Sequence, residues 1–154
     1  AHWKIAMSHV PYLSNGKHGN AGNLDEGMRV IFSNPDADGQ RYKLFLEEAF
    51  SNKIDMLVTG HDHSLQWIKP VESMGPAHII VSGAGGKSDK FQDPERNPTH
   101  YQAENELGFV WVHLTEERML LEFYLVNEDT GEFRLGYSRE ETKPVQEVAA
   151  PTPA

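Results

Sequence analysis

The chain has 154 residues, a net charge of −9 and no cysteine. This length suffices for one domain with its own core, and the lack of cysteine excludes disulfides, thiolate metal sites and a cysteine nucleophile. The negative charge disfavours nucleic acid or an anionic membrane as a partner held by bulk electrostatics, and no apolar run approaches the roughly 20 residues of a membrane span. An anionic substrate is still compatible with this charge, because a bound cation can dominate a local site.

The first half of the chain predicts strands, loops and one helix. Residues 3–8 form an apolar run that predicts a buried strand with His9 at its exit, and glycines and asparagines predict a loop at 14–23. A helix is predicted over 40–52, because apolar side chains recur there at positions i, i+3, i+4, i+7 and i+8. Residues 54–58 predict the next buried strand. This order of strand, loop, helix and strand indicates an α/β layer.

The second half predicts more strands and changes character toward its end. A short strand at 66–69 and a β-branched strand at 78–81 precede a polar surface loop at 87–106. Three strands joined by hairpins are then predicted, at 107–114, 119–127 and 132–138. Prolines and small residues in 142–154 predict a disordered tail, which leaves 1–141 as the domain.

Three histidines stand at the exits of predicted strands, which is where α/β folds place ligands. His9 follows the first strand, and His61 and His63 follow the strand at 54–58 after Gly60, a residue that allows a tight turn. In an extended segment residues i and i+2 point to the same side, so His61 and His63 can both face one pocket, and a slight turn could let each reach a different metal. Neutral imidazole suits zinc and iron. A lone His-x-His more often only hydrogen-bonds, but this motif after a buried strand, with a second strand-exit histidine upstream, predicts metal ligands.

Four segments together resemble the calcineurin-like metallophosphoesterases, and most closely the purple acid phosphatases of the small tartrate-resistant type. They are residues 3–11, 60–66, 81–85 and 107–110, and they occur in the family's order and spacing. The resemblance covers about residues 1 to 140 by motif reading. It implies that the chain is the C-terminal half of a four-layer αββα sandwich that ends in an antiparallel β-meander. Half of such a sandwich would leave a sheet edge and an apolar face uncovered.

The resemblance also implies a role for each histidine of the site. His9 and His61 would bind the divalent ion of a metal pair, and His63 would bind the other ion, which is ferric iron in purple phosphatases. The pair would be Fe with Fe, Zn or Mn, and it would activate a water for in-line attack on a phosphate monoester. His18 would face the substrate phosphate and stabilise it or protonate the leaving group, whereas on its own it would be read as a solvated loop histidine. The implied substrates are phosphorylated small molecules or phosphoproteins, and family members are commonly exported.

The family's carboxylate motifs are missing from this sequence. Asp-x-His, Gly-Asp-x-x-Tyr and Gly-Asn-His-Glu are absent, and Gly19-Asn20 is followed by Ala21. Since Ala1 opens the chain without an initiator methionine or a signal peptide, we expect a fragment whose N-terminal half is a necessary partner. Its histidines alone would hold metal only partially. A phosphodiesterase or nucleotidase on the same scaffold, and a non-catalytic binding module, remain alternatives.

Seven other basic residues are not predicted to be ligands. His2, His78, His100 and His113 are predicted to be surface or core histidines that only hydrogen-bond. Lys87, Lys90 and Arg96 could add positive charge at the rim of the pocket, but they are more often solvated loop charges in such a sequence.

Overall fold

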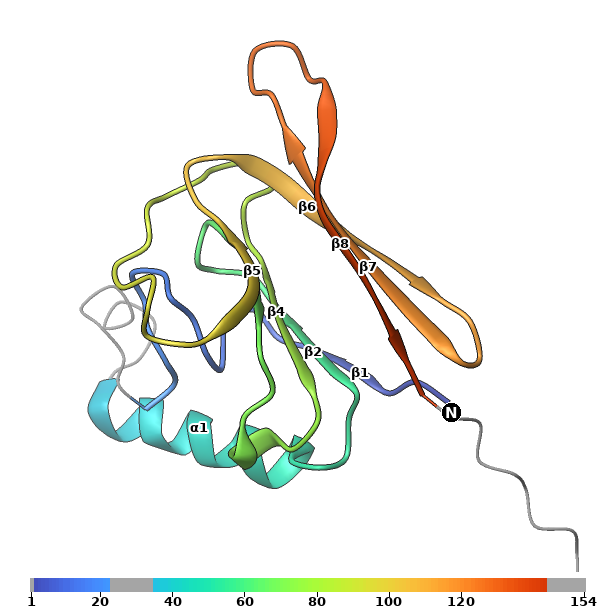
Figure 1. Cartoon of the computed structure of the whole chain (residues 1–154). Helices are drawn as coiled ribbons and strands as arrows, with labels where there is room; N and C mark the ends of the chain where they lie inside the picture. Colours follow the sequence, from blue (N-terminus) through green and yellow to red (C-terminus); the bar gives the residue numbers. More distant parts are fainter. Residues whose placement is uncertain (1, 23–34, 144–154) are drawn as a thin grey trace, which may run out of the picture.

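The computed structural model describes residues 2–22 and 35–143, and the side chains from residue 39 onward in the second range. Two β-sheets pack face to face, and helix α1 covers the outer face of the larger one (Figure 1). The five strands of the larger sheet, sheet A, are β1 (Ile5–Met7), β2 (Met56–Thr59), β3 (Leu65–Ile68), β4 (His78–Ser82) and β5 (Thr99–Ala103). The smaller sheet, sheet B, holds β6 (Leu107–Leu114), β7 (Arg118–Val126) and β8 (Phe133–Thr142). The helical elements are α1 (Pro35–Phe50) and a short 3₁₀ turn, η2 (Glu72–Met74).

Sheet A has the order β1-β2-β4-β3-β5, and its first three strands run parallel. Strands β3 and β5 are antiparallel to their neighbours. The carboxyl ends of β1, β2 and β4 therefore meet at one edge of the sheet, where α/β folds bind ligands. The segments that follow these strands contain His9, His61 and Gly83, so the topology brings these three residues to the same edge of sheet A.

The core is divided by sheet A into two apolar layers. Leu46 of α1 packs with Leu57 and Ile79 on one face of the sheet. On the other face, Ile80 packs with Phe123 of β7 and its neighbours in sheet B. Burying each such side chain contributes roughly 1.5–3 kcal/mol. Because both faces are covered, β2 and β4 are continuous apolar runs, as expected of buried parallel strands.

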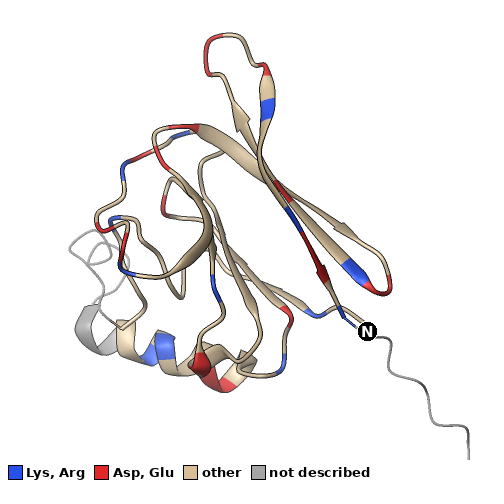
Figure 2. Cartoon of the chain, in the orientation of Figure 1, with Lys and Arg blue, Asp and Glu red and all other residues tan. Residues whose placement is uncertain are grey.

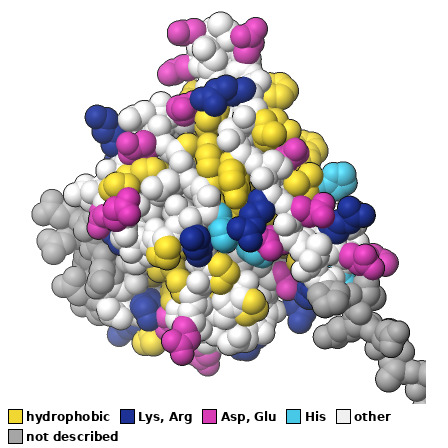
Figure 3. All heavy atoms as spheres, in the orientation of Figure 1, with side chains coloured by type: hydrophobic (Ala, Val, Ile, Leu, Met, Phe, Trp, Pro, Cys, Tyr) yellow, Lys and Arg dark blue, Asp and Glu magenta, His cyan; other side chains and the backbone are white. Residues whose placement is uncertain are grey.

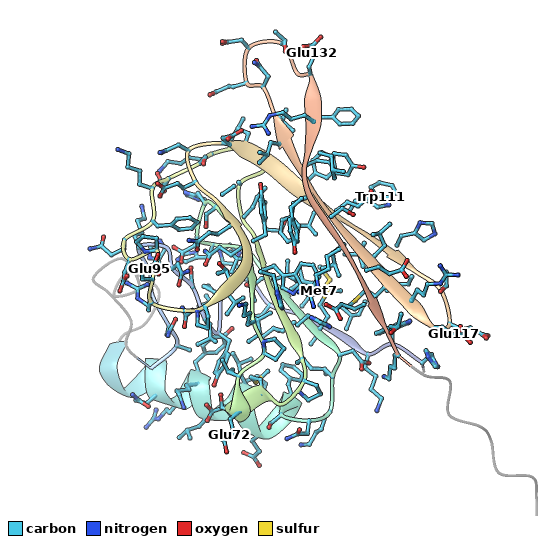
Figure 4. All side chains as sticks on the ribbon, in the orientation of Figure 1. Met7, Glu72, Glu95, Trp111, Glu117 and Glu132 are labelled. Carbon is cyan, nitrogen blue, oxygen red and sulfur yellow. The ribbon has the colours of Figure 1, made fainter. Side chains whose placement is uncertain are left out.

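Sheet B is an antiparallel β-meander with a different pattern. Along β7 the residues alternate between buried and partly exposed, because one face packs on sheet A and the other does not. The exposed face carries Phe109, Trp111, Phe133 and Leu135, and Trp111 is 58% exposed and points away from sheet A (Figure 4). Apolar side chains at this side of the molecule are visible in Figure 3. Within the described residues, no further layer covers this face.

The predicted fold class, a mixed α/β arrangement ending in an antiparallel meander, is confirmed. Helix α1, sheet A and sheet B are three successive layers, in the order α, β and β, of the αββα sandwich that the resemblance implies. Acidic and basic residues are interspersed along strands and loops (Figure 2). Within the described residues, no helix is long and apolar enough to cross a membrane.

Several predicted boundaries differ from the structure. The first strand was expected to be buried, but β1 is a three-residue edge strand, and Ile5 and Met7 are 40% and 80% exposed. The helix begins at Pro35, five residues before the predicted start, and a first-turn proline is well tolerated because its missing N–H has no helical partner. Strand β5 lies inside the predicted 87–106 loop. Strand β8 extends to Thr142, and the rest of the predicted tail from residue 144 lies outside the described residues.

Candidate functional site

The exits of β1 and β2 are joined by backbone hydrogen bonds. Ser8 N–H donates to the Val58 carbonyl at 3.0 Å, and Gly60 N–H donates to the His9 carbonyl at 3.0 Å. Tyr42 of α1 holds the exit of β1 in place. Its hydroxyl lies 2.7 Å from the Ser8 hydroxyl and donates to the Val10 carbonyl at 2.7 Å. The helix and both strand exits thus fix where His9 and the motif after β2 begin.

Three imidazoles from two distant segments form one cluster. The Nδ1 atom of His61 lies 3.0 Å from Nε2 of His9. The ring of His18 lies on the other side of His61, with the two ring centroids 4.2 Å apart. His18 is 8% exposed, so its interpretation as a solvated loop histidine is wrong. The structure therefore brings His9, His18 and His61 together.

The turn after β2 is made by His61 and not by Gly60. His61 has a φ of 61°, in the left-handed region that non-glycine residues seldom adopt. A Cβ added at Gly60 would meet only the His9 carbonyl oxygen, at 3.9 Å. Residues 61–64 are consequently bent and not extended, so the i, i+2 rule does not apply to His61 and His63. His61 contacts His9 and His18, whereas His63 takes a different partner.

Asp62, between the two motif histidines, is buried in the site and 2% exposed. Its Oδ1 accepts a hydrogen bond from the His18 backbone N–H at 3.2 Å and lies 3.9 Å from His18 Nε2. Two glycines leave room for it. A Cβ at Gly16 would lie 2.4 Å from the Asp62 carboxyl carbon, and a Cβ at Gly83 would lie 2.0 Å from the Asp62 carbonyl oxygen. The sequence does not predict a role for Asp62, yet its contacts hold the loop that carries His18 against the segment from His61 to His63.

The loop that carries His18 is also anchored by Asn15, whose side chain is fully buried. Its Nδ2 donates to Gln102 Oε1 at 2.7 Å, and its Oδ1 accepts from Asn97 N–H at 2.9 Å. Its backbone N–H donates to Gln66 Oε1 at 2.8 Å. Arg96, predicted to be a solvated charge, donates to the Ser14 and Gly16 carbonyls at 2.8 and 2.9 Å. The residues bonded to Asn15 lie 51 to 87 positions away from it along the chain. No local sequence pattern could therefore have revealed these hydrogen bonds.

His63 forms a pair with Asp89, a residue that the sequence reading missed. His63 Nδ1 lies 2.9 Å from Asp89 Oδ2. Lys17 and Lys87 lie 3.4 and 3.3 Å from the same carboxylate, so Lys87 is not an isolated loop charge. The hydrogen bond from His63 and the two lysines lower the pKa of Asp89 to about 2. Asp89 is therefore ionised at neutral pH and acts there as a hydrogen-bond acceptor.

The electrostatics around His61 favour its neutral imidazole. Burial, and then the neighbouring His18 and His9 rings, lower the pKa of His61. The neutral ring is the form that binds metal ions. His61 is thus favoured in the form that a metal site requires.

The geometry fits part of a metal site. Two imidazole nitrogens bound to one ion at about 2.1 Å lie roughly 3.4 Å apart at a tetrahedral angle and roughly 3.0 Å apart at an octahedral angle, and the 3.0 Å between His9 Nε2 and His61 Nδ1 matches the octahedral value. The same distance suits a hydrogen bond between the two rings when one nitrogen carries a proton. Within residues 2–22 and 35–143, no group of three or more His, Cys, Asp or Glu side chains is arranged to hold an ion. These residues therefore supply two adjacent nitrogens, and a complete coordination sphere requires further ligands.

A cleft of about 370 Å³ opens beside these nitrogens, between sheet A and sheet B. Its lining includes His9 and Gly60 at one end, and Met7, Val58 and Val110 along its walls. Met7 of β1 lines this cleft, and β1 is an edge strand of sheet A in the described part of the chain.

Comparison with known proteins agrees with the motif reading. No family model matches the chain. The chain is 30% identical to purple acid phosphatase 3 of Arabidopsis thaliana over 129 residues, which are 80% of this chain and 29% of that protein. It is 29% identical to purple acid phosphatase 4 of the same plant over 131 residues, which are 82% of this chain and 32% of that protein.

Two solved structures are similar to a lesser degree. Vacuolar protein sorting 29 from Cryptosporidium parvum has a TM-score of 0.42 and 17% identity, over 83% of this chain and 54% of that one. Vps29 from Entamoeba histolytica, crystallised with zinc, has a TM-score of 0.39 and 15% identity, over 67% of this chain and 46% of that one.

The chain resembles the calcineurin-like metallophosphoesterases, as predicted. Within that class it is similar to the purple acid phosphatases over about 80% of its own length. It spans only 29 to 33% of the length of three of these relatives.

Proposed function

We propose that the protein containing this chain hydrolyses phosphate monoesters at a binuclear metal centre, for which this chain supplies the histidine ligands. The observation that carries the proposal is the 3.0 Å approach of His9 Nε2 and His61 Nδ1, two nitrogens from residues 52 apart in sequence. The similarity to purple acid phosphatases supports the same reaction class. The ions of such a centre, iron with iron, zinc or manganese, would lower the pKa of a bound water and polarise the phosphoryl oxygens.

The three ligand histidines divide into two groups. His9 and His61 share one ion, because their nitrogens lie 3.0 Å apart. His63 serves the second ion through Nε2, because its Nδ1 is already bonded to Asp89. His61 and His63 come from one short segment, whose left-handed turn at His61 directs the two rings to different partners.

His18 acts on the substrate and not on the metal. Its ring lies against His61, and its backbone is held by the Asp62 carboxylate. From there it would donate a hydrogen bond to a phosphoryl oxygen or give a proton to the leaving-group oxygen. Such positioned proton transfer contributes typically 10²–10⁴-fold to a rate.

The carboxylate ligands come from the rest of the protein. The cleft beside His9 is lined in part by the edge strand β1 of sheet A, and its walls there are apolar. An N-terminal half that continued sheet A beyond β1 would bring its own residues to the same strand ends. Substrates would then be phosphorylated small molecules or phosphoproteins, and the protein would be exported, as its relatives commonly are.

The test uses the full-length protein and p-nitrophenyl phosphate. We expect hydrolysis that is lost on complete removal of metal and restored by adding iron with zinc or manganese. Elemental analysis should give two ions per protein, and His61→Ala should lower both the metal content and the rate. Hydrolysis that survives complete metal removal would contradict the proposal.

A second candidate is a non-catalytic binding module, which the incomplete coordination sphere of the described residues favours. It predicts fewer than two tightly bound ions and no hydrolysis by the full-length protein. A diesterase or nucleotidase on the same scaffold is separated by comparing bis-p-nitrophenyl phosphate and a nucleoside monophosphate with the monoester.

A further inference from the structure

Asp89 holds His63 at two points. Its backbone N–H donates to the His63 carbonyl at 2.8 Å, and its Oδ2 lies 2.9 Å from His63 Nδ1. The two residues are 26 positions apart, and the contact joins the loop after β4 to the motif after β2. A single exposed ion pair is worth little, since both side chains are free to leave it. A side-chain bond and a backbone bond to the same residue fix both the distance and the direction of the carboxylate.

The loop around Asp89 is itself tied to the body of the protein. The N–H groups of Gln92 and Asp93 both donate to the Asn15 carbonyl, at 3.1 and 3.2 Å. The N–H of Phe91 donates to the Glu104 carboxylate just after β5. The loop that carries Asp89 is therefore also held by contacts that do not involve His63.

Two lysines also lie close to the Asp89 carboxylate. Lys87 lies 3.3 Å from Oδ1, and Lys17 lies 3.4 Å from Oδ2. Lys17 belongs to the loop that carries His18, so Asp89 connects the segments after β1, β2 and β4. The lysines hold the Asp89 carboxylate in the position in which its Oδ2 atom faces the His63 ring.

A carboxylate that lies beside two lysines acts as a hydrogen-bond acceptor, so the 2.9 Å contact places the proton on His63 Nδ1, which donates to Asp89 Oδ2. The tautomer of a neutral histidine is set by the bond that one ring nitrogen makes, and the other nitrogen then presents its lone pair. We propose that Asp89 is the positioning residue of His63, fixing its Nδ1–H tautomer and ring direction so that Nε2 is presented as a ligand. The ligand part of this inference rests on the proposed function, whereas the tautomer part does not.

The first readout is the tautomer of His63 in the metal-free, full-length protein. Long-range ¹H–¹⁵N correlation spectra distinguish Nδ1–H from Nε2–H, and His63→Gln assigns the signals. We expect Nδ1–H in the wild type and a shift toward Nε2–H in Asp89→Ala. Asp89→Asn should retain Nδ1–H in part, because the amide oxygen can still accept the bond. Asp93→Ala is the matched control, since Asp93 is an exposed carboxylate of the same loop whose side chain accepts only from Glu95 N–H.

The second readout is the affinity for zinc, measured by titration with a competing chelator. Loss of a partner that orients a ligand histidine typically costs 10–100-fold in metal affinity. We expect a loss of that size for the second ion in Asp89→Ala, a smaller loss in Asp89→Asn and none in Asp93→Ala. Thermal unfolding identifies any variant that fails to fold, and Asp89→Asn then carries the comparison.

Each outcome decides one part of the inference. An Nε2–H tautomer in the wild type, or an Nδ1–H tautomer that persists unchanged in Asp89→Ala, would overturn it. Unchanged zinc affinity in a folded Asp89→Ala variant would overturn the ligand part. If the tautomer depends on Asp89 but the wild type binds no metal, the positioning of His63 is supported and the proposed function fails.

Discussion

Replacing Gly83 by alanine is expected to damage the site, because the Asp62 backbone occupies the space that a side chain would need. A Cβ at Gly83 would lie 2.0 Å from the Asp62 carbonyl oxygen and 2.9 Å from the carbonyl carbon. Ordinary contact requires about 3.5 Å, so the segment from Gly60 to Asp62 must move by more than about 1 Å. Overpacking of this kind costs typically 1–3 kcal/mol of stability. A displacement of about 1 Å of catalytic groups can cost 10²-fold in rate.

The matched control is Gly85→Ala, two residues further along the same loop. A Cβ at Gly85 would have nothing within 4 Å, so stability should change by no more than about 0.5 kcal/mol. The assay is phosphate-ester hydrolysis by the full-length protein, with denaturant unfolding measured in parallel. A Gly83→Ala variant with stability and rate like those of Gly85→Ala would refute the reasoning.

Three further predictions concern other parts of the site and the core. His18→Ala should lower kcat for monoester hydrolysis by about 10²–10⁴-fold with metal content unchanged, and a loss of metal instead would show that His18 is a ligand. Asn15→Ala should lower the free energy of unfolding by roughly 2–4 kcal/mol, because buried groups of Asn97 lose their partner; a change below about 0.5 kcal/mol in denaturant unfolding would contradict this. Burial lowers the pKa of His78 in the folded protein below 6.5. The contribution of His78 to the free energy of unfolding is therefore complete above about pH 6.5 and is lost as the pH falls through the folded-state pKa. His78→Gln should therefore reduce the slope of stability against pH below pH 6.5, and an unchanged slope would show that His78 titrates equally in both states.

The parts of the fold that sequence could predict are those whose pattern is local. Strand β4 is an apolar run because both of its faces are covered, and β7 alternates because only one face is. The strand-exit positions of His9 and His61 followed from the same patterns together with the parallel order of the strands. Local pattern and tertiary structure agree at these elements, so the prediction succeeded.

The parts that sequence could not predict depend on residues far apart in the chain. Exposure of β1 depends on its edge position in the sheet, which its apolar run does not reveal. Strand β5 is polar and partly exposed along its length, and only its pairing with β3 makes it a strand. The bonds that Asn15 and Asp89 make are long-range and involve residue types that are usually solvated.

The central claim is that the motif histidines bind a pair of metal ions in the full-length protein. The most direct measurement is a crystal structure of that protein grown with iron and zinc, with each ion located by anomalous scattering at its own absorption edge. We expect one ion in contact with His9 Nε2 and His61 Nδ1, and a second in contact with His63 Nε2. A structure in which His9 and His61 hydrogen-bond to each other with no ion between them, or in which the ions bind elsewhere, would contradict this claim.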